Sequence, residues 1–298
     1  MVLLTFATLY LIYMIYSMTG YGKSVLQLPT KKVTIELKSL NSKSIDLNVR
    51  MPSIYREKEL DIRKQLAKDL ERGKVDFSIY VETTADDTST QINTPVVQKY
   101  MQQLNEVVPG DGIELLKMAM RLPDALNTVR EEINEAEWQH IEAGIKETID
   151  AITQYRLDEG KILEADFKAR IETLSNLLEE VVKIDPERVE AVRERLHKGV
   201  AELKEKYDEN RFEQELVYYI EKYDITEEKV RLTNHLNYFI ESINSKDSNG
   251  KKLGFIGQEM GREINTIGSK SNYAPMQQLV VQMKDELEKI KEQLLNVL

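Results

Sequence analysis

Between residues 17 and 84, apolar and polar positions alternate in three short runs, at 33–37, 45–49 and 75–81. A period of two is typical of strands with one buried face, so we expect an antiparallel sheet covered on one side. The segment REKELDIRKQLAKDLERG lies between the second and third runs. Its leucines are near helical spacing and it ends in glycine, which predicts a helix. The N-terminal part is therefore predicted to be α+β.

From residue 94 onward, the apolar period lengthens to that of amphipathic helices. Thr94-Pro95 has the residues of a helix start, and a long amphipathic stretch covers 133–182. Asp185-Pro186 is predicted to start another helix, and a further one is expected from Thr226. Two final helices are expected to flank a polar turn at 265–270. The predicted architecture is an N-terminal antiparallel sheet with a helix, followed by a long-helix, mainly α C-terminal region.

At 298 residues the chain is long enough for two domains. We expect an N-terminal α+β domain at 14–155, including the first helices, and a helical C-terminal domain at 156–298. Residues 1–13 form an apolar extension before Met14, which we take as the native start. The apolar run is shorter than the roughly 20 residues of a spanning helix, and no basic residues precede it, so we expect no membrane partner.

The chain contains no cysteine. This excludes disulfides and thiolate zinc sites and fits the reducing environment of the cytoplasm, where we expect the protein. A bound metal would need oxygen or imidazole ligands, which favours magnesium or manganese. The sequence also lacks a Walker-type phosphate loop, an HExxH zinc pattern and a Ser-His-Asp elbow.

The net charge of −10 argues against a protein that simply coats nucleic acid, but the charge is unevenly distributed. Residues 14–84 contain 13 Lys and Arg against 9 Asp and Glu, and residues 250–275 contain 4 against 2. Residues 85–249 contain 21 against 36. Basic ends thus flank an acidic middle. Because exposed charges are screened beyond about 8–10 Å, a local anion-binding surface is compatible with the acidic average.

Glu259 and Glu263 are four residues apart in the segment GQEMGREINTIGSK, so they project from one helix face with Arg262 beside them. Carboxylates at this spacing can hold a hard divalent cation. A surface salt bridge between Glu259 and Arg262 explains the same spacing, and for the pair alone it is the commoner case. The turn that follows adds groups suited to phosphate binding, at Asn265, Ser269 and Lys270.

His235 is one of three histidines and can act as a general acid or base near neutral pH. Its position in VRLTNHLNYFIE is also typical of a half-buried histidine on an amphipathic helix, which is the commoner case. In the N-terminal part, four basic residues near the predicted strand ends can contact phosphate: Lys43, Arg50, Arg72 and Lys74. Tyr16, Tyr21 and Tyr80 can stack on bases, but basic rims on a small sheet explain these clusters equally well.

Several of these segments resemble the YicC family. They are SMTGYGKS at 17–24, ELKSLNSKSIDL at 36–47, RGKVD at 72–76, NHLNYF at 234–239 and KKLGFIGQEMGREINTIGSKSN at 251–272. The resemblance runs in order from about Met14 to the C-terminus, and REINTIGSK is its most specific part. Tyr273 stands where the family often has an acid, and Ser44 stands where an aromatic is usual. If that acid is a metal ligand in the family, its absence weakens a metal site here.

The resemblance implies a bacterial endoribonuclease that needs a divalent metal and assembles as a homohexamer around an RNA-binding cavity. Taken with the residues, it leads to the hypothesis that Glu259 and Glu263 hold magnesium or manganese, with His235 as a third catalytic residue. The phosphate-binding residues would be Arg262, Asn265, Ser269, Lys270, Lys43, Arg50, Arg72 and Lys74. The alternative is a non-catalytic RNA-binding adaptor that presents RNA to another nuclease, and a purely structural helical oligomer is a third reading.

Overall fold

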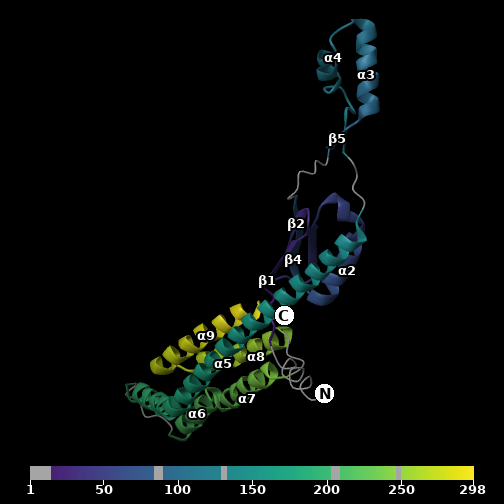
Figure 1. Ribbon diagram of the computed structural model, residues 1–298. Coiled ribbons are helices and arrows are strands. Elements are labelled where there is room, and N and C mark those ends of the chain that lie inside the picture. The colour runs from purple at the N-terminus through teal and green to yellow at the C-terminus, as the bar shows by residue number, and fades with distance from the viewer. Residues whose placement is uncertain (1–14, 84–89, 129–132, 203–208, 246–249) are drawn as a thin grey trace, which may run out of the picture.

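The computed structural model describes residues 15–83, 90–128, 133–202, 209–245 and 250–298. Figure 1 shows three parts: a sheet with helices in the middle of the molecule, a small helical module at one end and a helical bundle at the other. The predicted apolar extension at 1–13 lies outside the described residues. No helix in these described ranges is long and apolar enough to cross a membrane.

The sheet contains four strands in the order β1 (Gly20–Gln27), β2 (Lys31–Leu40), β4 (Gly73–Thr83) and β3 (Ile45–Arg50). β1 pairs with β2, and β2 with β4, in antiparallel fashion, but β3 pairs with β4 in parallel. The α+β class is confirmed, whereas the prediction of an antiparallel sheet is wrong for this last pair. A 3-10 helix (η1, Ser53–Lys58) and helix α2 (Glu59–Leu70) lie between β3 and β4. Such a crossover returns the chain to the end where β3 began, which makes the two strands parallel.

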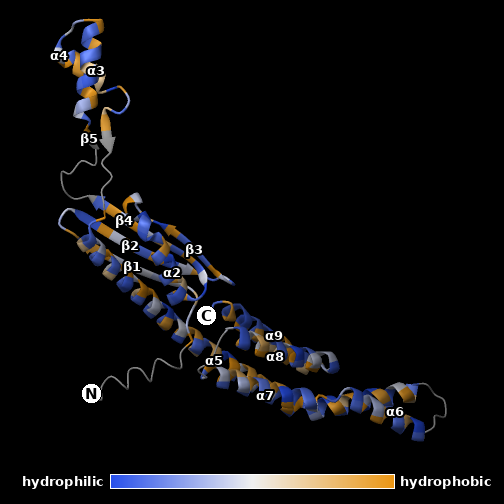
Figure 2. Ribbon diagram, turned by 90° about the vertical axis from the view of Figure 1, so that its right-hand side faces the viewer, coloured by the Kyte–Doolittle hydropathy of each residue, from blue (hydrophilic) through white to orange (hydrophobic). Residues whose placement is uncertain are grey.

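One face of the sheet is buried and the other is open. Val33, Ile35 and Leu37 of β2 belong to a core formed with α2 and the first half of α5 (Glu135–Glu202). Figure 2 shows α5 running along the sheet beside β1. The alternation predicted for 33–37 and 75–81 is therefore an alternation between core and solvent.

Helix α5 has 68 residues and connects the sheet with the bundle (Figures 1 and 2). It passes without a break through residues 155 and 156, where we placed the border between two domains. It also continues through Pro186, so the prediction of a new helix at Asp185-Pro186 is wrong. Proline removes one helical hydrogen bond. Buried positions nevertheless continue on both sides of it, at Val181 and Val192, and their packing keeps the chain helical.

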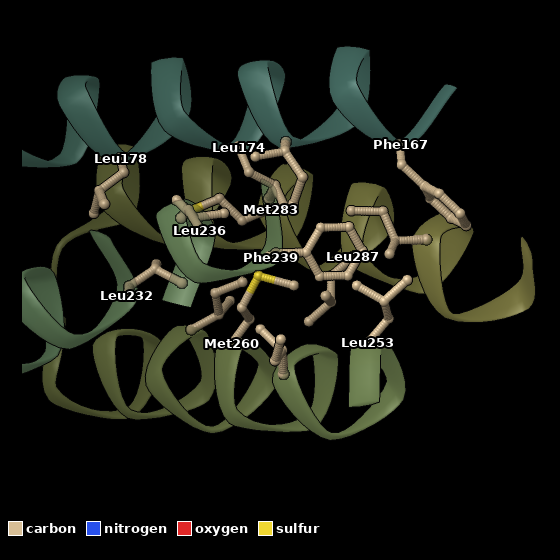
Figure 3. Close-up of a cluster of buried hydrophobic side chains, with 14 of the residues drawn as sticks. Phe167, Leu174, Leu178, Leu232, Leu236, Phe239, Leu253, Met260, Met283 and Leu287 are labelled. Atoms are coloured by element: carbon tan, nitrogen blue, oxygen red, sulfur yellow. The ribbon is translucent and has the colours of Figure 1, made fainter. Parts of the chain in front are cut away.

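The bundle combines the second half of α5 with α6 (Glu209–Lys222), α7 (Thr226–Ile243), α8 (Gly250–Lys270) and α9 (Ala274–Leu294). Leucine, isoleucine, valine, phenylalanine and methionine side chains from α5, α7, α8 and α9 form its core, and Figure 3 shows part of it. Phe167 of α5 and Phe239 of α7 meet edge to face, with ring centroids 5.9 Å apart. This contact fixes α7 against α5.

Helix α8 continues through the segment that we predicted to be a turn at 265–270, and the loop before α9 is residues 271–273 instead. Ile264 and Ile267 are fully buried and extend the apolar period of the helix. A Cβ at Gly268 would lie 2.9 Å from Val280 Cγ1 of α9. This glycine therefore allows α8 and α9 to approach each other and does not end a helix.

The module at the other end contains β5 (Thr90–Ile92), α3 (Thr94–Val107), α4 (Gly112–Ala119) and β6 (Leu126–Thr128). The predicted helix start at Thr94-Pro95 is confirmed. A small core around Val97 and Ala119 holds the module together. Large apolar side chains such as Val107 and Ile113 remain exposed on its surface.

The N-terminal segment and the C-terminus meet on α5 beside the sheet. Met18 N donates a hydrogen bond to the Asn296 carbonyl (2.8 Å). Arg156 of α5 is almost fully buried there, and burial lowers the pKa of its guanidinium. That guanidinium donates to Ser39 Oγ (2.5 Å) and to the Leu70 and Met18 carbonyls (3.3 Å each). The side chain of Arg156 thus links α5 to β2, α2 and the N-terminal segment.

Gly160 is a contact point between α5 and the N-terminal segment. A Cβ at this position would lie 1.8 Å from the Ile15 carbonyl oxygen, which is a backbone atom and cannot rotate away. We expect Gly160→Ala to lower the free energy of unfolding by about 1–3 kcal/mol, because the segment must move off the helix. In the same helix, the Cβ position of Gly199 has no atom of another described residue within 4 Å, apart from the helix's own neighbouring backbone. Gly199→Ala should be neutral or stabilise by about 0.4–1 kcal/mol. Urea unfolding followed by circular dichroism measures both, and equal stability of the two variants would contradict this packing.

Candidate active site

Polar side chains line the edge where the antiparallel helices α7 and α8 meet. Arg231 Nη1 of α7 lies 4.0 Å from Glu263 Oε1 of α8. Further along, Lys252 Nζ of α8 lies 5.2 Å from the centre of the Tyr238 ring of α7. His235 is one helical turn beyond Arg231 and is half-buried between these two contacts. His235 therefore lies beside the part of α8 that precedes Glu263.

Glu263 is only 8% exposed, yet the described part of the chain gives its side chain no hydrogen bond. Its contact with Arg231 is at the outer limit of an ion pair, and Arg231 is held more closely by Glu227. A nearly buried carboxylate normally has a close charged or hydrogen-bonding partner, because burying an unpaired charge is costly. Glu263 is therefore the carboxylate of this edge best suited to take a cationic ligand.

Glu259 lies one turn before Glu263 on α8, as the spacing predicted, but its side chain is 41% exposed. Arg262 forms an ion pair with it at 2.8 Å. The salt bridge that the sequence left open as an alternative is thus present. Exposed ion pairs of this kind contribute little to stability. At low cost, a phosphate can therefore replace Glu259 as the partner of Arg262, and a cation can replace Arg262 as the partner of Glu259.

The two carboxylates provide part of a ligand set for a hard divalent cation. Magnesium typically binds one or two carboxylates together with phosphate oxygens and water. Throughout the described ranges there is no group of three or more His, Asp or Glu side chains that could hold a metal. The residues present fit a metal only if phosphate oxygens complete the ligand set. Arg231 and Arg262 must then release the carboxylates.

The other candidate residues of α8 do not surround a common point. Lys270 Nζ donates to Glu228 Oε1 (2.8 Å) and so joins the end of α8 to the start of α7. Ser269 Oγ donates to the Thr266 carbonyl of its own helix (3.0 Å), and Asn265 is exposed on the surface of α8. The predicted turn is wrong, and the N–H groups of a helix interior are already bonded within the helix. Phosphate binding here would rest on side chains alone.

Sequence reasoning missed two residues of α7. Arg231 reaches Glu263, and Glu228 is buried with Oε1 bonded to Lys270. Its other oxygen, Oε2, has no hydrogen-bond partner within the described residues. The sequence signal for both is the spacing of three to four residues through 228, 231, 235 and 238. That spacing becomes informative only when α8 is known to lie against it.

The basic residues predicted in the N-terminal part are not gathered at this edge. Arg72 Nη2 donates to the Val297 carbonyl (2.9 Å), so Arg72 holds the C-terminus in place. Lys43, Arg50 and Lys74 are exposed, and none of them has an ion-pair partner in the described part of the chain. They belong to the sheet, whereas α7 and α8 belong to the bundle (Figure 1). Within one chain, the two groups of predicted RNA-binding residues do not converge.

Comparison with known families assigns the chain to a class. The family model described as "Endoribonuclease YicC-like, N-terminal region" matches residues 15–165, and the one described as "Endoribonuclease YicC-like, C-terminal" matches residues 181–298. A Clostridioides difficile protein named "Probable endoribonuclease YicC" is 33% identical over 293 residues, which are 95% of this chain and 100% of that protein. A protein of the same name from Haemophilus influenzae is 26% identical over 287 residues, with the same coverage. The chain therefore belongs to the YicC-like endoribonuclease family, as its motifs indicated.

The contact between Lys270 and Glu228 leads to a prediction about stability. Lys270→Gln removes the cation beside a buried carboxylate, and we expect the free energy of unfolding to fall by about 1–3 kcal/mol. Lys251 is an exposed lysine of the same helix, and Lys251→Gln serves as the control. Thermal unfolding followed by circular dichroism measures the difference. If the two variants melt together, Lys270 is free to bind a ligand and does not hold α7 to α8.

Proposed function

We propose that this chain is a divalent-metal-dependent endoribonuclease that hydrolyses phosphodiester bonds of RNA at the edge between α7 and α8. The family and the names of its relatives support the reaction class. One structural observation carries the choice of site. Glu263 is a nearly buried carboxylate without a close partner in the described part of the chain, and it lies on the edge that also carries His235.

Five polar residues of this edge have roles in the proposed reaction. Glu259 and Glu263 would hold a magnesium or manganese ion, which when bound would polarise the phosphodiester and activate water. Arg231 and Arg262 exchange their carboxylate partners for the phosphate, because a guanidinium binds phosphate with two hydrogen bonds. They then stabilise the negative charge that grows on the phosphate in the transition state. His235 transfers a proton at the reacting oxygens.

The proposal includes RNA and further copies of this chain, in a homohexamer, as partners in the cytoplasm. Lys43, Arg50 and Lys74 lie on the sheet and the reacting edge lies on the bundle, so one chain does not bring them to one RNA segment. Closed symmetry can place the sheet of one copy beside the bundle of another. Exposed apolar side chains on α3 and α4, Val107 and Ile113 among them, are suited to contacts between copies.

A second candidate function is a non-catalytic adaptor that binds RNA and presents it to another nuclease. The ion pair between Glu259 and Arg262 favours it, since the carboxylate then only orients a phosphate-binding arginine. The absence of a three-ligand metal group from the described residues favours it as well. In this case the protein binds RNA without cutting it.

Removal of the metal and of one carboxylate tests the proposal. We expect purified protein to cut labelled RNA in manganese or magnesium and to stop in excess chelator. Glu263→Gln keeps the size and polarity of the side chain but removes the charge that would hold the ion. Cutting should fall by at least about 100-fold, with assembly and thermal stability unchanged.

Glu172→Gln is the matched control, because Glu172 is an exposed glutamate on α5 outside this edge. It should cut like the unaltered protein. Full activity of Glu263→Gln would rule out the ligand role of Glu263. RNA binding without any cutting by the unaltered protein would favour the adaptor.

The ends of the RNA products test the assignment of His235. A water activated by the metal leaves a 5′-phosphate and a 3′-hydroxyl, and His235→Gln should then slow cutting by about 100-fold without changing the ends. A cyclic 2′,3′-phosphate would instead indicate attack by the ribose 2′-hydroxyl, with His235 as the base. Mass spectrometry of a cleaved oligoribonucleotide distinguishes the two.

A further inference from the structure

The open face of the sheet carries a small cleft that takes no part in the reaction at α7 and α8. Its volume is about 230 Å³, and its lining includes Glu36, Lys38, Arg50, Asp76, Ser78 and Tyr80. Pockets for whole drug-sized ligands measure about 300–1,000 Å³. This cleft is smaller, so it suits one flat ring or one phosphate group.

Arg50 is the cation of this cleft that is left for an external anion. Lys23 and Lys38 both pair with Glu36, at 3.1 and 3.3 Å, and the hydrogen bond from Lys23, helped by Lys38, lowers the pKa of Glu36. The negative charge of Glu36 is thereby balanced by two lysines of the sheet itself. Arg50, in contrast, is exposed and has no ion-pair partner among the described residues.

Tyr80 supplies a flat apolar surface on the same face. It is 53% exposed, and no hydrogen bond or ring contact of its side chain occurs within the described ranges. Arg50 of β3 lies opposite Ser78 of β4, and Tyr80 follows Ser78 by two residues. Two residues along a strand span about 7 Å, so Tyr80 is displaced from Arg50 by about this distance along the strand direction. A single nucleotide can bridge that distance between its base and its phosphate.

We propose that this cleft binds one unpaired nucleotide of the RNA substrate, with its base stacked on Tyr80 and its phosphate bound by Arg50. The inference rests on the proposed function, because it names a binding surface for the same RNA. The nucleotide must be unpaired, since a base within a duplex has both faces covered by its neighbours. The carboxylates of Glu36 and Asp76 line the cleft and can accept hydrogen bonds from the N–H groups of a base edge.

A second copy of this chain is the other occupant that this face would fit, because Val25 and Leu40 are exposed on neighbouring strands. The lining of the cleft argues against it. The cores of protein interfaces are depleted of charged residues, and an interface would bury Arg50 without a partner unless the other copy supplied one. An RNA phosphate supplies that partner directly.

Binding of a single-stranded oligoribonucleotide tests the inference, measured by fluorescence anisotropy in excess chelator so that no RNA is cut. We expect Tyr80→Ala to weaken binding about 5- to 100-fold, because the stacking surface is lost. Tyr80→Phe keeps the ring and should bind within about twofold of the unaltered protein. Tyr155→Ala is the control, since Tyr155 is a similarly exposed tyrosine on α5, and it should not change binding.

Two further measurements separate the outcomes. An oligoribonucleotide with 5-iodouridine should crosslink to Tyr80 under light, which peptide mass spectrometry detects. Light scattering of Tyr80→Ala should give an unchanged particle mass, and a smaller particle would overturn the inference in favour of a contact between copies. Equal binding by Tyr80→Ala and Tyr155→Ala, or no binding by the unaltered protein, would overturn it too. Failure of the unaltered protein to cut RNA, with the Tyr80 effect still present, would reject the proposed function and leave this binding site standing.

Discussion

The close approach of the N-terminal segment and β1 to helix α5 is the contact on which the rest of the structure depends. Glycines make it possible, since a Cβ at Gly22 would lie 2.3 Å from the Thr148 carbonyl oxygen of α5. Because α5 is one helix of 68 residues, a contact that fixes its first half against the sheet also orients the bundle built on its second half. Arg156 completes the junction by donating hydrogen bonds to the Leu70 carbonyl of α2 and the Met18 carbonyl of the N-terminal segment.

Contacts between arginines and carboxylates organise the edge of α7 and α8. Arg262 holds Glu259 closely, whereas Arg231 reaches Glu263 only at 4.0 Å. The two carboxylates therefore differ in exposure and in how firmly they are held, although both lie on one face of α8. In the proposed reaction, an incoming phosphate would attract both arginines and so free both carboxylates when RNA binds.

The separation of the sheet from the bundle gives the chain two surfaces of different character. The sheet offers exposed cations and an exposed tyrosine, and the bundle edge offers carboxylates with a histidine. The acidic residues of the middle of the chain lie largely on long exposed helix faces, where solvent screens their charge. The net charge of −10 therefore says little about either surface. The proposed assembly is what would bring the two surfaces to one RNA.

The α+β class, the family, the strand runs and the placement of Glu259 and Glu263 on one helix face could all be predicted, because they follow from local periodicity and motifs. The other features depend on contacts between distant segments. Pro186 and Gly268 read locally as a helix start and a turn, but packing keeps each within a helix. Buried residues lie on both sides of Pro186, and Gly268 follows the buried Ile264 and Ile267 and packs against Val280 of α9. The parallel pairing of β3 depends on where α2 returns the chain, and Arg72 contacts a carbonyl 225 residues away. Glu228 and Arg231 became part of the site only when α8 packed against α7, since a contact between distant segments leaves no period in the sequence of either one.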